Sequence, residues 1–185
     1  MNGVRTEYYR SGSRLLGQKQ GSNVMQFLYD ASGLYGFLYN GTPHYYVYNG
    51  QGDVVRLISA SGATEAMYTY DAWGKILSVT DGSGSAVSDA SHIANVNPIR
   101  YRGYYYDVET GFYYLQSRYY DPEVGRFINA EPNADYGEFD DGSEILGYNV
   151  YAYCFNNPVN SFDPDGEAVA NIVGGVIGGV AGAAH

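Results

Sequence analysis

Residues 101–132 of the chain read YRGYYYDVETGFYYLQSRYYDPEVGRFINAEP. In this stretch a Tyr-Asp pair is twice followed by glycine after a short spacer, in Tyr106-Asp107 with Gly111 and in Tyr120-Asp121 with Gly125. An aspartate side chain is suited to accept a hydrogen bond from the backbone N–H two residues on, and glycine adopts the left-handed conformation that sends the chain back. The pattern therefore predicts two hairpin turns, each entered from a strand that ends in tyrosine.

Three earlier copies extend this motif toward the N-terminus. They are Tyr29-Asp30 with Gly33, Tyr48-Asn49 with Gly52, and Tyr70-Asp71 with Gly74. The spacing is irregular, but five copies in one chain indicate a repeat. We expect a β-turn to open at the Asp or Asn of each copy, and we expect the glycine of each copy to have a positive φ.

Composition supports an all-β fold of repeated antiparallel hairpins. The chain has 22 Tyr and 25 Gly in 185 residues, and tyrosine favours strands while glycine favours tight turns. We expect hairpins from strands 44–48 and 53–59 and from strands 65–71 and 75–81, with further strands at 99–106, 112–120 and 126–128. Residues 81–91 are rich in Gly, Ser and Asp and predict a loop. At most one short helix is expected, at 148–155, where Tyr148, Tyr151 and Phe155 have helical spacing.

The aromatic block at 104–120 is the expected core of the second half. We expect it to be the best-packed part of the chain, with Phe112, Tyr114 or Leu115 buried. Cys154 is the only cysteine, so no internal disulfide is possible. We expect its side chain to be a small buried hydrophobe.

Charge excludes several classes of partner. The formal net charge is −10, with 20 Asp and Glu against 10 Lys and Arg. Nucleic-acid binding needs basic patches that displace counterions from phosphates, so no nucleic-acid partner is expected, and an anionic membrane surface is disfavoured for the same reason. Residues 1–5 lack the apolar segment of a signal peptide. Because the repeats begin almost at residue 1, we expect the chain to be a fragment of a longer protein.

The ordered motifs of the second half carry a family resemblance. Residues 101–132, with GYNVYAYCFNNPVNSFDPDG at 147–166, resemble the RHS repeat-associated core domain, and the upstream copies resemble the Tyr-Asp (YD) repeats that precede that core. The resemblance covers most of the chain. It implies a YD-repeat β-strip at 1–97, a core domain at 98–167, and the start of a Gly/Ala-rich pre-effector segment at 168–185.

The resemblance also implies a function. In this family the repeats wind into a hollow, curved β-shell, the core domain plugs one end, and the polypeptide after the core is a variable effector, commonly a toxin, held inside. The implied partners are therefore the remainder of the shell and the C-terminal effector. No cofactor is implied, and the implied location is secreted or at the cell surface. In many members the core resembles an aspartyl protease in action and cuts the chain just after an Asp-Pro-x-Gly-Leu motif.

Two acidic residues are the implied catalytic pair. Asp163, in the Asp-Pro-Asp-Gly sequence at 163–166, matches the second acid of the family, and Glu131 stands where the family has an aspartate. Two nearby carboxylates acquire different pKa values, so that one activates water while the other donates a proton. The expected cut is between Glu167 and Ala168, or at the bond before it. Glu131 is longer than aspartate and Glu167 replaces the family's leucine, so the alternative is that both acids are turn formers in an inactive plug.

Other candidate sites have less support. Residues 163–166 resemble the first part of a calcium loop, but the other ligands of a twelve-residue loop are missing. His44, His92 and His185 are too far apart in sequence to suggest a zinc site, so no metal is expected. The many tyrosines could stack on sugars, but we expect them to form cross-strand packing pairs. We expect Arg118 to anchor the fold by pairing with a carboxylate such as Asp121.

The tail at 168–184 is uncharged and contains five glycines. We expect a linker or pre-effector segment that packs inside the parent shell. A membrane span is the alternative, because Gly174, Gly178 and Gly182 have helix-packing spacing. For the whole chain, the leading hypothesis is encapsulation of an effector with self-cleavage. The rivals are an extracellular adhesion or carbohydrate-binding β-repeat without proteolysis, and an inactive remnant.

Overall fold

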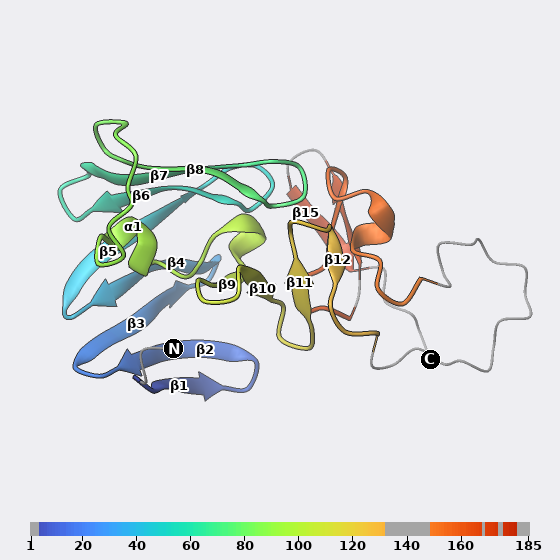
Figure 1. Cartoon of the computed structure of the whole chain (residues 1–185), viewed down its shortest axis with the longest axis horizontal. Coiled ribbons are helices and arrows are strands. Elements are labelled where there is room, and N and C mark those ends of the chain that lie inside the picture. Colours follow the sequence, from blue (N-terminus) through green and yellow to red (C-terminus); the bar gives the residue numbers. More distant parts are fainter. Residues whose placement is uncertain (1–3, 132–148, 168, 174–175, 181–185) are drawn as a thin grey trace, which may run out of the picture.

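The structure is a computed structural model that describes residues 4–131, 149–167, 169–173 and 176–180. Its first half is one antiparallel sheet whose eight strands lie side by side in sequence order (Figure 1). We call this sheet the strip. Its strands are β1 (Thr6–Ser11), β2 (Arg14–Gln20), β3 (Asn23–Asp30), β4 (Gly33–Tyr39), β5 (Thr42–Tyr48), β6 (Val54–Ser59), β7 (Thr64–Tyr70) and β8 (Ile76–Asp81).

The five predicted turns are confirmed. In each copy the acidic or amide side chain accepts a hydrogen bond from the N–H two residues on, at 2.7–3.0 Å. The five final glycines all have positive φ, between 72° and 122°. The accepting residues are Asp30, Asn49, Asp71, Asp107 and Asp121.

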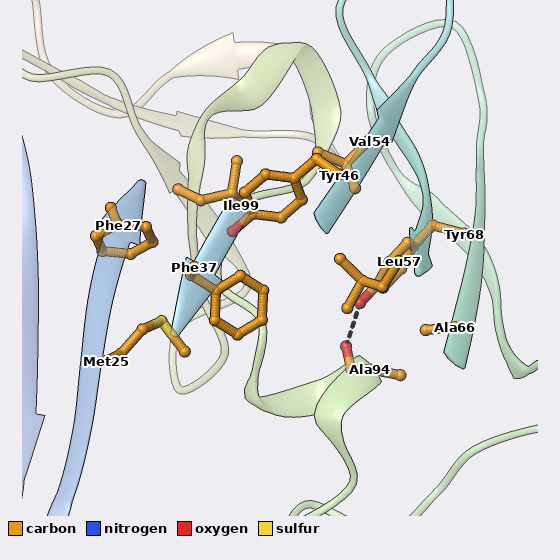
Figure 2. Close-up of a cluster of buried hydrophobic side chains, with 10 residues drawn as sticks. All are labelled: Met25, Phe27, Phe37, Tyr46, Val54, Leu57, Ala66, Tyr68, Ala94 and Ile99. Carbon is orange, nitrogen blue, oxygen red and sulfur yellow. Dashed lines mark hydrogen bonds between the residues drawn. The ribbon is translucent and has the colours of Figure 1, made fainter. Parts of the chain in front are cut away.

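One face of the strip forms an apolar core. Buried and more exposed residues alternate along the strands, as in β5, where His44 and Tyr46 are buried. The chain after β8 returns over this face and carries the short helix α1 (Ile93–Val96). The Tyr68 hydroxyl donates to the Ala94 carbonyl oxygen at 2.8 Å, which fastens the helix to β7 (Figure 2). The buried residues are Met25, Phe27, Phe37, Tyr46, Val54, Leu57, Ala66, Tyr68, Ala94 and Ile99.

The second half, which we call the C-terminal unit (98–131 and 149–167), has its own core. A four-stranded sheet in the order β12-β11-β10-β9 follows a 3-10 helix at Tyr101–Gly103. Its core is rich in tyrosine: Tyr101, Tyr104, Tyr113, Leu115, Tyr120, Phe127, Tyr153 and Cys154. The strands are β9 (Tyr105–Asp107), β10 (Phe112–Tyr114), β11 (Tyr119–Asp121) and β12 (Arg126–Phe127). A third sheet joins β13 (Ser161–Phe162), β14 (Ala170–Val173) and β15 (Val176–Val180).

Three tyrosines of the C-terminal unit hold the turn between β7 and β8. Their hydroxyls donate to the carbonyl oxygens of residues 72–74, which are consecutive in the chain. The turn fits closely, since a Cβ on Gly74 would lie 2.5 Å from the Tyr101 ring. The pairs are Tyr101 with Ala72 at 2.9 Å, Tyr120 with Trp73 at 2.7 Å, and Tyr113 with Gly74 at 2.9 Å.

Arg102 makes a second junction between the strip and the C-terminal unit. Its backbone N–H donates to the Asp53 carboxylate at 3.0 Å, and its guanidinium donates to the carbonyl oxygens of Gln51 at 2.8 Å and Pro158 at 2.5 Å. Asp53 is 5% exposed and Arg102 8% exposed, so both charged groups are buried. They lie 3.7 Å apart and form an ion pair. This buried polar junction fixes the turn between β5 and β6 against the C-terminal unit.

Two of the predicted strands are shorter than expected. The strand predicted at 112–120 is divided into β10 and β11 by a turn in which Gln116 has φ 66°. The strand predicted at 99–106 is interrupted by the 3-10 helix, where Arg102 has φ 53°. Within the block, Leu115 is buried as expected, but Tyr113 faces inward in place of Phe112 and Tyr114, which are partly exposed.

The helix predicted at 148–155 is wrong for the residues that the structure describes. Cys154, Phe155 and Asn156 all have positive φ, which an α-helix of L-residues does not tolerate. Burial does not follow the helical spacing either, because Tyr151 is 44% and Phe155 55% exposed while Cys154 between them is buried as predicted. Tyr148 lies outside the described residues.

The tail contains strands where the structure describes it. β13 pairs with β14 and β14 pairs with β15, both antiparallel. The helix-packing interpretation of Gly178 is therefore wrong, since this residue lies in β15. Gly174 and Gly182 fall outside the described residues. No helix in the described part of the chain is long and apolar enough to cross a membrane.

Leu115→Ala tests the core of the C-terminal unit. Leu115 is 1% exposed, so its truncation removes buried methyl groups and leaves a cavity. We expect the free energy of unfolding to fall by about 2–5 kcal/mol. Leu77→Ala is the matched control, because Leu77 is 62% exposed and should change stability by less than about 0.5 kcal/mol. Equal losses in a urea titration of both variants would contradict this core.

Gly74→Ala tests the docking of the strip against the C-terminal unit. The new methyl group would overlap the Tyr101 ring, in addition to the strain of φ 89°. Gly62→Ala has nearly the same strain, at φ 83°, but its methyl group would meet nothing within 4 Å. We expect Gly74→Ala to lower the melting temperature clearly more than Gly62→Ala, because only Gly74 adds overpacking to strain. Equal decreases in the melting temperature would mean that the turn at Gly74 is not packed tightly against Tyr101.

Candidate functional site

Residues 163–167, which we call the acid loop, follow β13 directly. Asp163 turns its carboxylate back on the loop, where Oδ1 accepts from the Gly166 N–H at 2.7 Å. Gly166 has φ 81°, and a Cβ there would lie 2.5 Å from the Ser117 hydroxyl oxygen, so this position requires glycine. The local sequence therefore folds the loop around the Asp163 side chain, which is fully buried.

Tyr104 holds the backbone of Asp163. Its hydroxyl donates to the Asp163 carbonyl oxygen at 2.6 Å and accepts from the Asp163 N–H at 3.2 Å. The Tyr153 hydroxyl lies 3.1 Å from the hydroxyl oxygen of Tyr104. Both tyrosines are buried, so the hydrogen bonds that position the acid are shielded from water. Sequence reasoning did not single out Tyr104, because its partner lies far along the chain.

Arg118 is the centre of the site. Its Nη2 lies 2.7 Å from Glu131 Oε2 and 3.3 Å from Asp163 Oδ2. Nε donates to the Gly166 carbonyl oxygen, and the guanidinium packs 3.5 Å from the Phe127 ring centre. Arg118 is an anchor, as predicted, but the predicted partner was wrong.

Asp121, the predicted partner of Arg118, instead forms a hydrogen bond within a turn. Its side chain accepts from the Glu123 N–H at 2.8 Å and so opens the turn between β11 and β12. The ion pair between Arg118 and Asp121 was expected because the two residues are close in sequence. Strand β11 separates them, so that Asp121 lies at the turn while Arg118 contacts Glu131 and Asp163.

The structure brings the two predicted acids together. Both carboxylates contact the same nitrogen of Arg118, so their nearest oxygens are at most about 6 Å apart, within reach of one water molecule. Glu131 reaches this point because its backbone N–H pairs with the Val150 carbonyl oxygen at 3.0 Å. The site thus combines residues from three separate segments of the chain.

Burial and charge act in opposite directions on Asp163. Burial raises its pKa from 3.8 to about 6, while the Gly166 N–H and Arg118 work to lower it. Burial also lowers the pKa of Arg118. The Glu131 side chain is 20% exposed against 1% for Asp163, so Glu131 is the less buried of the two acids. This environment gives the two acids different surroundings, a fully buried carboxyl group with a raised pKa and a less buried one, a division suited to acid–base chemistry.

The predicted cleavage bond lies at the end of the acid loop. Glu167 is exposed, and its N–H donates to the Asp165 carboxylate at 3.1 Å. Ala168 lies outside the described residues, so of the two residues that this bond joins the structure describes only Glu167. The carbonyl oxygen of Gly166 accepts from the same Arg118 guanidinium that contacts the two acids.

The histidines and the cysteine that the sequence offered as candidate site residues have structural partners, or are buried, where the structure describes them. His44 Nδ1 lies 2.7 Å from Glu65 Oε2, His92 accepts from the Ala94 N–H at the start of α1, and His185 lies outside the described residues. The described residues contain no group of three or more His, Cys, Asp and Glu side chains arranged for a metal ion. Burial raises the pKa of the Cys154 thiol to about 12, so it is a poor nucleophile.

Many of the tyrosines pack against one another. Rings of neighbouring strands stack, as in Tyr35 with Tyr45 at 6.2 Å between ring centres. In the C-terminal unit, Tyr120 and Tyr153 approach to 4.2 Å. These contacts are the cross-strand and core pairs that the composition predicted.

Comparison with known proteins identifies the family of the chain. The family model described as RHS Repeat matches residues 48–86. The tRNA3(Ser)-specific nuclease WapA of Bacillus spizizenii is 38% identical over 180 residues, which cover 94% of this chain. The chain is an RHS/YD-repeat protein. The double-stranded DNA deaminase toxin A of Burkholderia cenocepacia is 39% identical over 105 residues, or 57% of this RHS-repeat chain.

A solved structure shares the fold. The structure of the Photorhabdus luminescens Tc holotoxin pore matches 90% of the RHS-repeat chain with a TM-score of 0.57 and 20% identity, and the match covers 9% of that chain. The RHS-repeat chain likewise spans only 7% of the WapA relative and 6% of the deaminase toxin. The shared region is thus a small part of much longer proteins.

Asp163→Asn tests the raised pKa of Asp163. The folded chain binds this proton more tightly than the unfolded chain, so the contribution of Asp163 to the free energy of unfolding decreases as pH rises from about 4 to about 6. Asparagine keeps an acceptor for the Gly166 N–H but does not titrate. We expect the stability difference between the natural chain and the variant to change by about 2 kcal/mol across this range in urea titrations.

Asp81→Asn is the control of opposite sign. Hydrogen bonds from Ser83 lower the pKa of Asp81, so its contribution is gained rather than lost as pH rises. A stability difference for Asp163→Asn that does not change with pH would contradict the burial of an ionisable group at this position.

Proposed function

We propose that this RHS-repeat chain closes one end of a β-shell that encloses a C-terminal effector, and that Glu131 and Asp163 cut the chain just beyond the acid loop. The first part is supported by the relatives. One is named a tRNA nuclease and another a DNA deaminase toxin, yet both contain a region similar to this chain. A region common to different activities is better explained as a carrier of effectors than as either enzyme.

The strip supports a role as a wall. Its strands follow one another as a meander, and β1 and β8 are its outer strands. The outer edge of β1 leaves backbone groups that a further strand can pair with, so more hairpins extend the wall without changing its design. Eight strands are too few to surround a polypeptide. The enclosure therefore requires the rest of a longer protein, for which we expect a secreted or surface location and no nucleic-acid partner for the shell itself.

One observation carries the proposal of cleavage. Glu131 and Asp163 come from separate segments and meet on Arg118, which also contacts the carbonyl oxygen of Gly166 in the acid loop. Strands β13 and β14 pair on either side of this loop, with Phe162 opposite Ala170. The acid and the bonds after Gly166 therefore belong to one short hairpin loop, and the substrate is held beside the acids by its own chain.

The chemistry follows from the two environments. Glu131, the less buried acid, takes a proton from water, and the oxygen of that water adds to the peptide carbonyl carbon. The positive charge of Arg118 stabilises the oxyanion that forms. Asp163, with its raised pKa, gives a proton to the departing amide nitrogen as the C–N bond breaks. The products are one new carboxylate and one new amine, and no further reactant is needed.

The alternative is an uncut plug. Asp163 also acts as a turn former, because its carboxylate accepts from the Gly166 N–H. Arg118 would then only neutralise the two acids that it contacts. Both hypotheses use the same contacts, and they differ only in whether the peptide bond breaks.

The mass of the purified chain decides between them. We expect the natural chain to separate into two pieces, and the masses place the cut at Glu167–Ala168 or at the preceding bond. Asp163→Asn and Glu131→Gln should stay whole, because an amide neither activates water nor donates the acid proton. Glu131→Asp should cut faster if the shorter acid fits the site better.

Glu123→Gln serves as the matched control for the acid variants. Glu123 belongs to the same unit, but its side chain is 64% exposed and pairs with Lys75 at 2.7 Å. It should cut at a rate close to that of the natural chain. Intact chains for both the natural sequence and Glu131→Asp would sink the protease proposal and leave the uncut plug.

A further inference from the structure

A pocket of about 310 Å³ opens between the first hairpin and the C-terminal unit. Its walls come from the β1–β2 turn, from the ends of β3 and β4, and from the C-terminal unit. Arg10 and Arg14 stand on one side, Tyr29 and Tyr114 support them, and Leu115 and Pro164 close the other side. Pro164 belongs to the acid loop, so the pocket lies directly behind it.

The two arginines are held without an acidic partner. The Arg14 guanidinium lies 4.6 Å from the centre of the Tyr29 ring, and that of Arg10 lies 5.4 Å from the centre of the Tyr114 ring. Among the described residues neither arginine forms an ion pair. Ring contacts of this kind fix the plane of a guanidinium while leaving its N–H groups available.

The positive charges of Arg10 and Arg14 both act on the Tyr29 hydroxyl. Burial raises the pKa of the Tyr29 hydroxyl, and Arg14 and Arg10 both oppose this rise. Both arginines also line the same pocket. No carboxylate lines the described pocket, although the chain as a whole carries 20 Asp and Glu.

The other walls are suited to an uncharged neighbour. Leu15, Leu34 and Ile99 add apolar surface, while Ser13 and Gln116 add hydrogen-bonding groups at the rim. The space is sufficient for one or two side chains. It is too small for a run of stacked bases, and the net charge of −10 repels a phosphate backbone.

We propose that this pocket binds a peptide segment in which a carboxylate side chain follows an apolar residue. The planar forks of Arg10 and Arg14 suit a carboxylate, which accepts two parallel hydrogen bonds from a guanidinium. The apolar side chain packs against Leu15, Leu34 and Pro164, which are partly exposed. Such a segment joins the first hairpin to the C-terminal unit, and its binding does not require the chain to be cut.

The blocked dipeptide acetyl-Leu-Glu-amide is the probe. Titration into the 185-residue chain, followed by NMR, should shift the signals of Arg10, Arg14 and Tyr29. Acetyl-Leu-Gln-amide, which differs only in the charge, should bind about tenfold more weakly, because a charged hydrogen-bonded pair is lost. Inorganic phosphate is the third arm and should also bind more weakly than the acidic dipeptide.

Matched variants identify the arginines. Arg10→Gln with Arg14→Gln should weaken binding of the acidic dipeptide at least about tenfold, and the two lysine replacements should restore part of it, since they keep the charge without the fork. Arg56→Gln, at an exposed position on β6, is the control and should bind normally.

Three outcomes overturn the proposal. They are equal binding of the two dipeptides, binding that survives the double glutamine variant, and phosphate binding as tight as that of the acidic dipeptide. The last outcome would indicate a general anion site rather than a peptide site. Because Asp163→Asn should leave dipeptide binding intact, a failure of the cleavage proposal is separable from a failure of this one.

Discussion

Three phenolic hydroxyls on three consecutive carbonyl oxygens are the contact on which the rest of the structure depends. A tight turn pressed into a core would leave its carbonyl groups without water, at a cost of about 1–3 kcal/mol each if they had no partner. Tyrosine supplies the ring that fills the core and the donor that satisfies the carbonyl group. Burial raises the pKa of Tyr101 to about 12, so the donor keeps its proton at neutral pH. Phenylalanine would fill the same space and leave the carbonyl oxygens unpaired.

The candidate site depends on this contact through β10 and β11. Tyr113 and Tyr120 place these two strands against the strip, and Arg118 lies in the turn between them. The position of Arg118 in turn determines where Glu131 and Asp163 meet. A cation between two acids changes the electrostatics expected of a bare carboxylate pair, because it favours the charged form of both. Burial is what raises the pKa of Asp163 against that influence.

Features that depend on neighbouring residues were predictable from the sequence. The five turns need only an Asp or Asn, a spacer and a glycine, and all five formed where the motif stands. The pairing of β5 with β6 and of β7 with β8 followed from those turns. The two acids were also identified, but through a family resemblance and not through spacing. Their meeting could not be read from their separation in the chain.

Features that depend on distant residues were not predictable. The partner of Arg118 was misassigned because Asp121 is near in sequence, whereas Asp163 is 45 residues away. The helix predicted at 148–155 followed aromatic spacing, but three left-handed residues turn the chain there so that Tyr153 and Cys154 reach the core. The inward face of β10 depended on the docked turn, which selects Tyr113.

The order of the strands along the strip has a kinetic consequence. Each strand pairs with the next in sequence, so every hairpin closes a short loop, and such local contacts form early while the chain is being made. The C-terminal unit differs, since its tyrosines reach back 29 to 47 residues and Gln51 bonds to Val159 across 108 residues. These long loops close last. Arg118 therefore meets both acids only after the strip beneath it has formed, and the proposed cut can begin only once the chain has folded.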